Sequence, residues 1–220
     1  MVAFTGTTVG RKYLMGVSGL IWAGFVFVHM CGNMLILISP QAYNAYGHAI
    51  VSNRPLLITS ELILIFALAT HIVSAIALTR QNRIAKGIAP VRAPNGDKST
   101  GLASRTMAAQ GALVLVFIIS HLVVFKFGNY YETTVDGVVM RDLSKVIFEV
   151  FQSWQPVAWY AFCLVLLGFH LSHGFGSIFQ SLGMLHPAYQ PKIRIASLVY
   201  GFVVSVGFLS QPIYVFLSQS

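Results

Sequence analysis

Four histidines stand deep inside four separate apolar segments of this 220-residue chain: His29, His71, His121 and His173. An imidazole inside a lipid bilayer is costly and normally has a partner. Imidazole nitrogen is also a common ligand of metal ions and of haem iron. Four such side chains at matched depths therefore indicate metal or haem ligation, and with it a protein that carries electrons across a membrane.

The composition places these histidines in membrane-spanning helices. Hydrophobic residues make up 56% of the chain and charged residues only 9%, whereas about a quarter of the residues in a soluble domain are charged. Roughly 20 apolar residues span a bilayer as a helix, because backbone groups in lipid must bond within their own segment. We therefore expect one all-α domain over residues 1–220, an integral membrane bundle of five transmembrane helices. The expected spans are about 14–38, 56–79, 107–128, 156–180 and 195–218.

The cationic residues predict the orientation of this bundle. Ten of the 14 lysines and arginines precede the first span or lie between spans two and three or spans four and five. Because cytoplasmic loops carry the excess of lysine and arginine, the N-terminus is expected in the cytoplasm and the C-terminus outside. The net charge of +8 then reflects topology, and no nucleic-acid partner is expected. Residues 39–55 and 129–155 are expected as outer loops, the second with a short amphipathic helix near 143–152.

The alternating direction of the spans sorts the histidines by depth. His29 and His121 fall in an outer layer, and His71 and His173 fall in an inner one. The layers are roughly 10–15 Å apart along the membrane normal, which suits two haems, each held by imidazoles from two facing helices. The predicted pairs are His29 with His121 and His71 with His173. Small residues near these ligands would leave room for a flat macrocycle: Gly24, Gly32, Ala67, Ser74, Gly168 and Gly174.

A simpler interpretation is that each histidine hydrogen-bonds a neighbouring helix, as polar residues in membranes do. A zinc site is disfavoured, because the two layers are too far apart for one tetrahedral ion and lack cysteine or carboxylate ligands. His170 lies one turn before His173 and could contact a haem edge or replace His173 as ligand, although depth favours His173. Neither Cys31 nor Cys163 belongs to a C-x-x-C-H motif, so any haem would be held non-covalently.

Several short segments together resemble one known family. They are GRKYLM at 10–15, HMCGN at 29–33, NR at 82–83, SRTM at 104–107, HLSHG at 170–174 and FQSLG at 179–183. The chain resembles the cytochrome b558 membrane-anchor subunit of succinate dehydrogenase and fumarate reductase, and the last two segments are the most specific part of the likeness. The resemblance implies five helices, two haem b groups and a quinone site in one multi-pass subunit of a bacterial-type inner membrane.

The resemblance also implies partners and ligands. A flavoprotein and an iron–sulfur protein would dock from the cytoplasm, with the succinate site on the flavoprotein and not on this chain, and a higher oligomer of the complex is allowed. The axial ligands of the family fall on the four span histidines, and anchors of this kind resemble those that work with menaquinone. Three arginines near the cytoplasmic helix ends are candidates to pair with haem propionates, or equally to act as topology signals and headgroup anchors. They are Arg80, Arg83 and Arg105.

One acidic side chain lies inside a span. Glu61 stands near the outer end of the second span, where an intramembrane carboxylate is by default a functional candidate. We expect it to transfer protons to or from a quinone near the outer haem; the alternative is that it is solvated or paired with Arg54. Further candidates for a quinone site are Asn33, Lys126 and Trp154 in the outer layer and Ser104 on the inner side.

Two other functions remain open on the sequence alone. A cytochrome with two haems could anchor another oxidoreductase, such as a hydrogenase or a formate dehydrogenase. A haem-free transporter could instead use the histidines to relay protons, although inverted repeats and broken helices, which such proteins often have, are not evident here. A reduced-minus-oxidised spectrum separates a cytochrome from a transporter.

Overall fold

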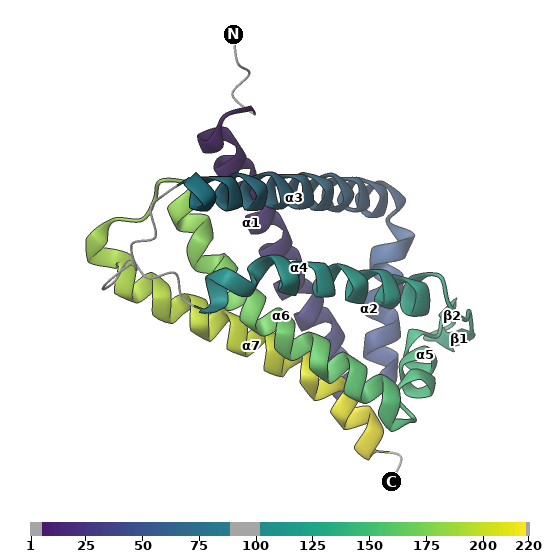
Figure 1. Ribbon diagram of the computed structural model, residues 1–220. Helices are drawn as coiled ribbons and strands as arrows, with labels where there is room; N and C mark the ends of the chain where they lie inside the picture. The colour runs from purple at the N-terminus through teal and green to yellow at the C-terminus, as the bar shows by residue number, and fades with distance from the viewer. Residues whose placement is uncertain (1–5, 89–101, 219–220) are drawn as a thin grey trace.

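The computed structural model describes residues 6–88 and 102–218, and this part of the chain is almost entirely helical (Figure 1). Five of its helical segments are long and apolar enough to cross a membrane: Thr8–Leu37, Arg54–Ala85, Thr106–Lys126, Trp154–Ser181 and Pro187–Leu217. The predicted all-α architecture with five candidate spans is therefore confirmed. The α-helices are α1 (Thr8–Asn33), α2 (Pro40–Ser52), α3 (Arg54–Ile88), α4 (Leu102–His121), α5 (Leu143–Val150), α6 (Trp154–Ser181) and α7 (Gln190–Leu217).

Two of the spans continue beyond their α-helix in a different helical form. A 3-10 turn, Met34–Leu37, extends α1, and a π-helical turn, Leu122–Lys126, extends α4 immediately after His121. In the π turn the Phe127 amide donates to the Leu122 carbonyl at 3.0 Å, five residues back. Such turns are rare and often lie at functional sites.

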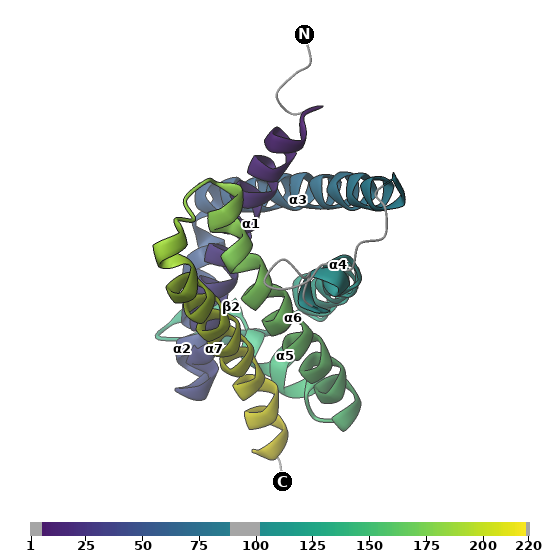
Figure 2. The ribbon, with the colours of Figure 1, turned by 60° about the vertical axis from the view of Figure 1, so that its left-hand side comes forward.

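The long helices cross at various angles. α6 and α7 run side by side, whereas α3 lies across α1 (Figure 1, Figure 2). α2, α5 and a β-hairpin gather at one end of the molecule, where α1 ends and α6 begins; we call these three elements the cap. The start of α1 and the end of α7 lie at opposite ends of the molecule, as an odd number of crossings requires.

The cap contains more regular structure than the sequence led us to expect. Residues 39–55 were expected as a loop, but α2 forms there, because the Ser39 hydroxyl accepts from the Ala42 amide and Pro40 supplies a rigid first turn. Strands β1 (Glu132–Val135) and β2 (Val138–Arg141) pair antiparallel around Asp136 and Gly137. Both turn residues have positive φ, 50° and 78°, as a tight hairpin of this twist requires.

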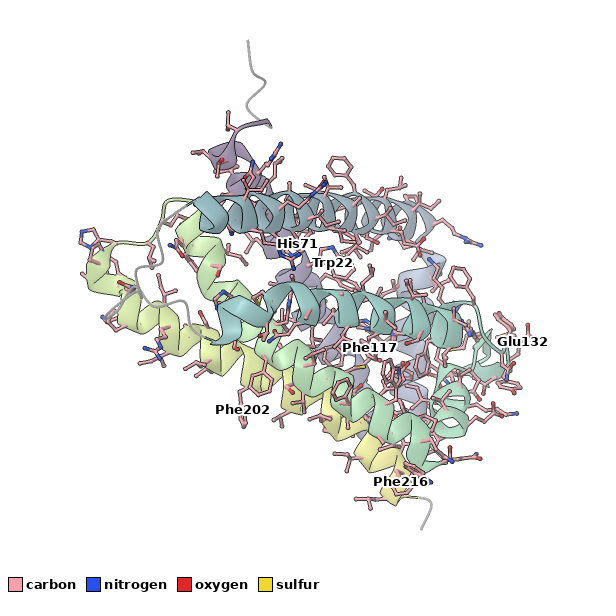
Figure 3. All side chains as sticks on the ribbon, in the orientation of Figure 1. Trp22, His71, Phe117, Glu132, Phe202 and Phe216 are labelled. Carbon is pink, nitrogen blue, oxygen red and sulfur yellow. The ribbon has the colours of Figure 1, made fainter. Side chains whose placement is uncertain are left out.

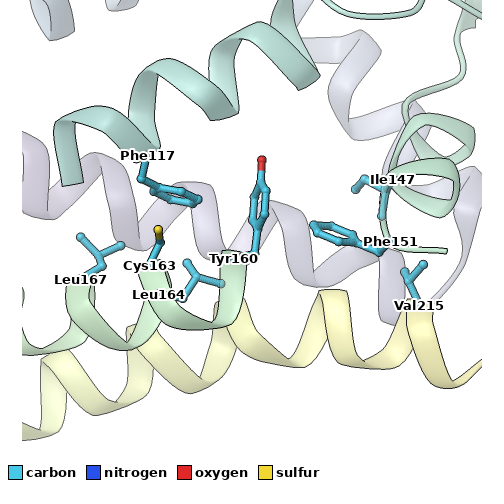
Figure 4. Packing of buried hydrophobic residues seen from close by; sticks show 8 residues of the cluster. All are labelled: Phe117, Ile147, Phe151, Tyr160, Cys163, Leu164, Leu167 and Val215. Atoms are coloured by element: carbon cyan, nitrogen blue, oxygen red, sulfur yellow. The ribbon is translucent and has the colours of Figure 1, made fainter. Parts of the chain in front are cut away.

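The helix expected near residues 143–152 is confirmed as α5, and it buries its apolar face. Figure 4 shows a buried cluster to which α4, α5, α6 and α7 all contribute. Its members are Phe117, Ile147, Phe151, Tyr160, Cys163, Leu164, Leu167 and Val215. The α5 part of the cap is therefore packed against α4, α6 and α7 through buried side chains.

Small residues bring α6 and α7 into close contact. A methyl group on Gly201 would lie 2.8 Å from the Ser172 Cβ, and one on Gly168 would lie 2.8 Å from the Ser205 Cβ. Distances under 3 Å are not tolerated between carbon atoms, so the backbones approach only because these positions are small.

Gly201→Ala is therefore expected to lower the free energy of unfolding by about 1–3 kcal/mol, the usual effect of overpacking. Thermal or denaturant unfolding in detergent measures it. The matched control is Gly24→Ala, because the same methyl group would meet no atom within 4 Å there. Equal free energies of unfolding for the two variants would show that the α6–α7 contact can accommodate the added methyl group.

A buried polar network joins α2 to α5 inside the cap. The Asn44 amide donates to Asp142 Oδ1 at 2.9 Å, the Ser144 hydroxyl donates to the same oxygen at 2.6 Å, and the Lys145 amide does so at 3.0 Å. Partial burial alone would raise the pKa of Asp142, but these hydrogen bonds outweigh it and lower the pKa below its usual value. The ionised carboxylate therefore stabilises the cap.

The stabilisation from Asp142 is expected to depend on pH. The pKa of Asp142 is lower in the folded protein than in the unfolded chain. The stabilisation is therefore complete above about pH 4 and is lost as the pH falls through the folded pKa. At neutral pH, Asp142→Ala should cost about 1 kcal/mol through the lost helix cap, and the difference from the parent protein should shrink in acid. Hydrogen exchange at the Ser144 and Lys145 amides measures the loss of stability at each pH. The control is Glu132→Ala, which removes an exposed acid on β1.

Candidate functional site

His29 and His121 meet inside the molecule. The centres of their rings are 5.9 Å apart, and the ring planes are nearly perpendicular at 86°. A metal–imidazole bond is about 2 Å long and the ring centre lies about 1 Å behind the nitrogen, so two imidazoles sharing one metal have centres about 6 Å apart. The separation therefore fits a pair that holds one iron between its rings.

Aromatic side chains surround this pair. Phe25 stacks on His29 with ring centres 5.3 Å apart, and Phe208 lies 5.8 Å from the same ring. Phe125 lies 5.1 Å from the ring of His121. An aromatic lining excludes water and lowers the local dielectric, and both effects influence the potential of a redox group.

Hydrogen bonds connect the pair to the cap and to α6. The Asn33 amide nitrogen donates to the His29 carbonyl at 2.7 Å and lies 3.3 Å from each nitrogen of the His29 ring. The Tyr43 hydroxyl donates to the Asn33 amide oxygen at 3.0 Å. Burial raises the pKa of Tyr43, which keeps this hydroxyl protonated and able to donate. On the other side, the Tyr160 hydroxyl lies 3.5 Å from His121 Nδ1.

Sequence reasoning missed the two tyrosines. Tyr43 lies on α2, which was expected as a loop, and Tyr160 contacts His121 from another helix. Neither tyrosine therefore stands at a sequence spacing from a histidine that would predict the contact. Asn33, four residues after His29, was named only as a quinone candidate; its position one helical turn away was the signal that could have shown its contact.

The second group of histidines joins α3 to α6. His71 Nδ1 lies 3.2 Å from the Ser18 hydroxyl oxygen on α1. His170 lies close enough to interact electrostatically with both His71 and His173, and its buried Nδ1 has no hydrogen-bond partner in the described part of the chain. His173 is half-buried, and among residues 6–88 and 102–218 no ring contact joins it to His71. His170 is thus the histidine of α6 that interacts with His71 in the described part of the chain.

These contacts bear on the simpler interpretation of the histidines. His29, His71 and His121 each have a hydrogen-bonding neighbour, as purely structural histidines would. A ligating imidazole needs such a neighbour too, because its second nitrogen is normally held by a hydrogen bond that orients the ring. Histidines with separate structural roles need not approach one another. The rings of His29 and His121, however, come from different helices and have centres 5.9 Å apart.

Glu61 and Lys126 form an ion pair. The Lys126 ammonium donates to Glu61 Oε1 at 2.6 Å, and the side chains are 38% and 43% exposed for Glu61 and Lys126, respectively. The alternative partner considered for Glu61, Arg54, is therefore wrong: it lies seven residues away on the same helix, about 10 Å along the axis. Two of the residues named for a quinone site are thus in contact.

Three of the other candidates lie on the surface of the molecule. Arg80, Arg83 and Trp154 are exposed. Ser104 and Arg105 lie in the first turn of α4, and their side chains are outside the described part of the structure. Figure 3 shows the side chains on the helices.

A pocket of about 520 Å³ lies between the π turn, α5 and α6, close to His121. Its wall includes Ser120, Glu149, Gln155, Trp159 and Tyr160. Because Tyr160 also contacts His121, the pocket and the histidine pair share a side chain.

The small residues near the histidines divide into two kinds. The space beside Gly32 is filled by the Tyr46 ring and that beside Gly168 by Ser205, so both glycines serve helix packing. By contrast, an added methyl group at Gly24 or Gly174 would meet nothing within 4 Å. Room for a flat ligand therefore remains beside only these two of the four glycines.

Within the described ranges, no three His, Cys, Asp or Glu side chains come together as a metal-binding group; the histidines meet as a pair. Comparison of the chain with protein-family models, with curated proteins and with solved structures gave no match.

Proposed function

We propose that this chain is the membrane-anchor cytochrome b subunit of a succinate:quinone oxidoreductase. In this role it passes electrons between an iron–sulfur partner and a membrane quinone, and it carries no succinate site of its own. The observation that carries the proposal is the approach of His29 and His121, two imidazoles from different spans, to a centre-to-centre distance of 5.9 Å.

The donor set fits haem b. All four proposed ligands are imidazoles, with His29 and His121 for an outer haem and His71 and His173 for an inner one. Haem b supplies a one-electron carrier whose potential depends on its axial ligands, their hydrogen bonds and the surrounding dielectric. Asn33 orients its histidine, and the aromatic residues around the outer pair keep water away.

The proposed partners follow from charge and from the resemblance. Ten of the 14 basic residues lie before the first span or in the segments between spans two and three and spans four and five, which the positive-inside rule assigns to the cytoplasm. A flavoprotein and an iron–sulfur protein would dock there, in a bacterial-type inner membrane, and menaquinone is the proposed quinone. The basic residues Arg80 and Arg83 are exposed at that end of α3, where they are open to headgroups or to a partner.

The chemistry of this chain at the quinone is proton transfer. Glu61 is the residue that carries the proton in that step, and its ion pair with Lys126 orients the carboxyl group. Both side chains remain partly exposed at this end of the spans, so the ion pair is open to a proton donor.

A reduced-minus-oxidised visible spectrum of the purified protein tests the proposal. We expect b-type bands, about two haems per chain by pyridine haemochromogen assay, and co-purification of a flavoprotein and an iron–sulfur protein. The absence of b-type bands would leave the proton-relay transporter. Haem with partners other than a flavoprotein would instead indicate an anchor for another oxidoreductase.

A further inference from the structure

Ser18 is a buried serine whose hydroxyl lies between two helices. It is 3% exposed, and its oxygen is 2.7 Å from the Leu14 carbonyl, 3.2 Å from the Met15 carbonyl and 3.2 Å from His71 Nδ1. Both carbonyls belong to its own helix, whereas His71 belongs to α3. The Ser18 hydroxyl is therefore the polar group of α1 that forms a hydrogen bond with this histidine.

Counting protons decides the direction of the bond to His71. A serine hydroxyl has one proton and two lone pairs. Carbonyl oxygens only accept, so the proton is committed to the Leu14 carbonyl, the closer of the two. Toward His71 the hydroxyl can therefore only accept, and Nδ1 of His71 must carry the proton.

A second contact fixes the ring on the same side. A methyl group on Gly19 would lie 3.6 Å from His71 Cε1, so the ring rests against Ser18 and Gly19 of α1. No hydrogen bond to His71 Nε2 exists in the described ranges. In Figure 3 His71 extends from α3 on the side that faces α4. The ring thus has a held, protonated nitrogen and a second nitrogen with a free lone pair.

We infer that Ser18 is the positioning residue for His71: its hydroxyl holds the Nδ1–H tautomer and leaves Nε2 free to bind iron. This inference rests on the proposed function, in which His71 is an axial ligand of the inner haem. A hydrogen bond to the second nitrogen fixes the orientation of a ligating imidazole and raises its basicity, and its loss typically costs 10–100-fold in metal affinity.

Ser18→Ala tests the inference with little risk to the fold, since alanine is the better helix former. The matched control is Ser197→Ala. Ser197 is also 3% exposed and donates to a carbonyl of its own helix at 2.6 Å, but within the described residues it has no hydrogen bond to a histidine. Ser18→Thr keeps the hydroxyl and serves as the rescue variant.

In the purified complex, we expect Ser18→Ala to release one haem to an acceptor protein about tenfold faster than Ser197→Ala does, and to shift the midpoint potential of that haem only. Ser18→Thr should restore both properties. Release of both haems at the parental rate, or an equal change in both haems, would overturn the inference.

Nitrogen NMR of histidine-labelled protein gives a readout that needs no haem. The His71 signals, identified by their loss in His71→Gln, should show a proton on Nδ1 in the parent and a mixture of tautomers in Ser18→Ala. A parent protein with no haem would defeat the proposed function, while this measurement would still decide the Ser18–His71 bond. A proton on Nε2 in the parent would overturn the inference by itself.

Discussion

Replacement of His121 by alanine is expected to remove one of the two proposed haems and to leave the other in place. An iron that loses one axial imidazole also loses the bond that holds the macrocycle between two helices, and alanine offers no replacement ligand. Haem content by pyridine haemochromogen assay should fall from about two to about one per chain. His48→Ala, which removes a histidine of α2 outside the spans, is the control and should retain both haems.

Double variants test the pairing. Because His29 and His121 are proposed to share one iron, His29→Ala combined with His121→Ala should lose no more haem than either single change. His121→Ala combined with His173→Ala should lose both haems, since these ligands belong to different pairs. Full haem content in the His121→Ala protein would refute ligation by this residue.

Replacement of Glu61 by glutamine is expected to slow quinone turnover by about 100-fold or more while haem content stays unchanged. Glutamine keeps the shape and part of the hydrogen bonding to Lys126 but cannot take up a proton, and a positioned acid or base contributes about 10²–10⁴-fold to the rate of such a step. Quinone reduction by the purified complex measures the effect. Glu132→Gln, at an exposed acid on β1, should turn over at the parental rate; so should Glu61→Gln if the carboxylate is only structural.

The five spans could be predicted from the sequence because one property, a long apolar run, decides whether a helix crosses a bilayer. The cap shows where this reasoning ends. Its α2 mixes tyrosine, asparagine, glycine and histidine without a clear apolar face, so only Ser39 and Pro40 marked its start. The hairpin did have a local signal, because the Asp136–Gly137 pair between alternating residues is typical of a tight hairpin turn.

The candidate site, too, could be predicted only in part from the sequence. Depth along each span selected His29 and His121 as neighbours, and their rings do meet; whether they bind iron stays a prediction. Depth could not choose the partner of Glu61, because several cations share the outer layer and only the relative rotation of two helices decides which of them it meets. It also could not show that His170, and not His173, has an interaction with His71, since one helical turn separates the two and the sequence does not show how α6 is rotated.

The π turn after His121 has a consequence for the length of the chain. A turn that closes five residues back holds one residue more than the α-helical turn in its place. Deleting a single residue between Leu122 and Lys126 should therefore restore α-helical winding and leave the direction of the following side chains nearly unchanged, because five π-helical residues turn the chain about as far as four α-helical ones. A chain of the same architecture that is one residue shorter at this point can therefore still place a cation against the acid of the second span, so such a length difference is compatible with the same ion pair.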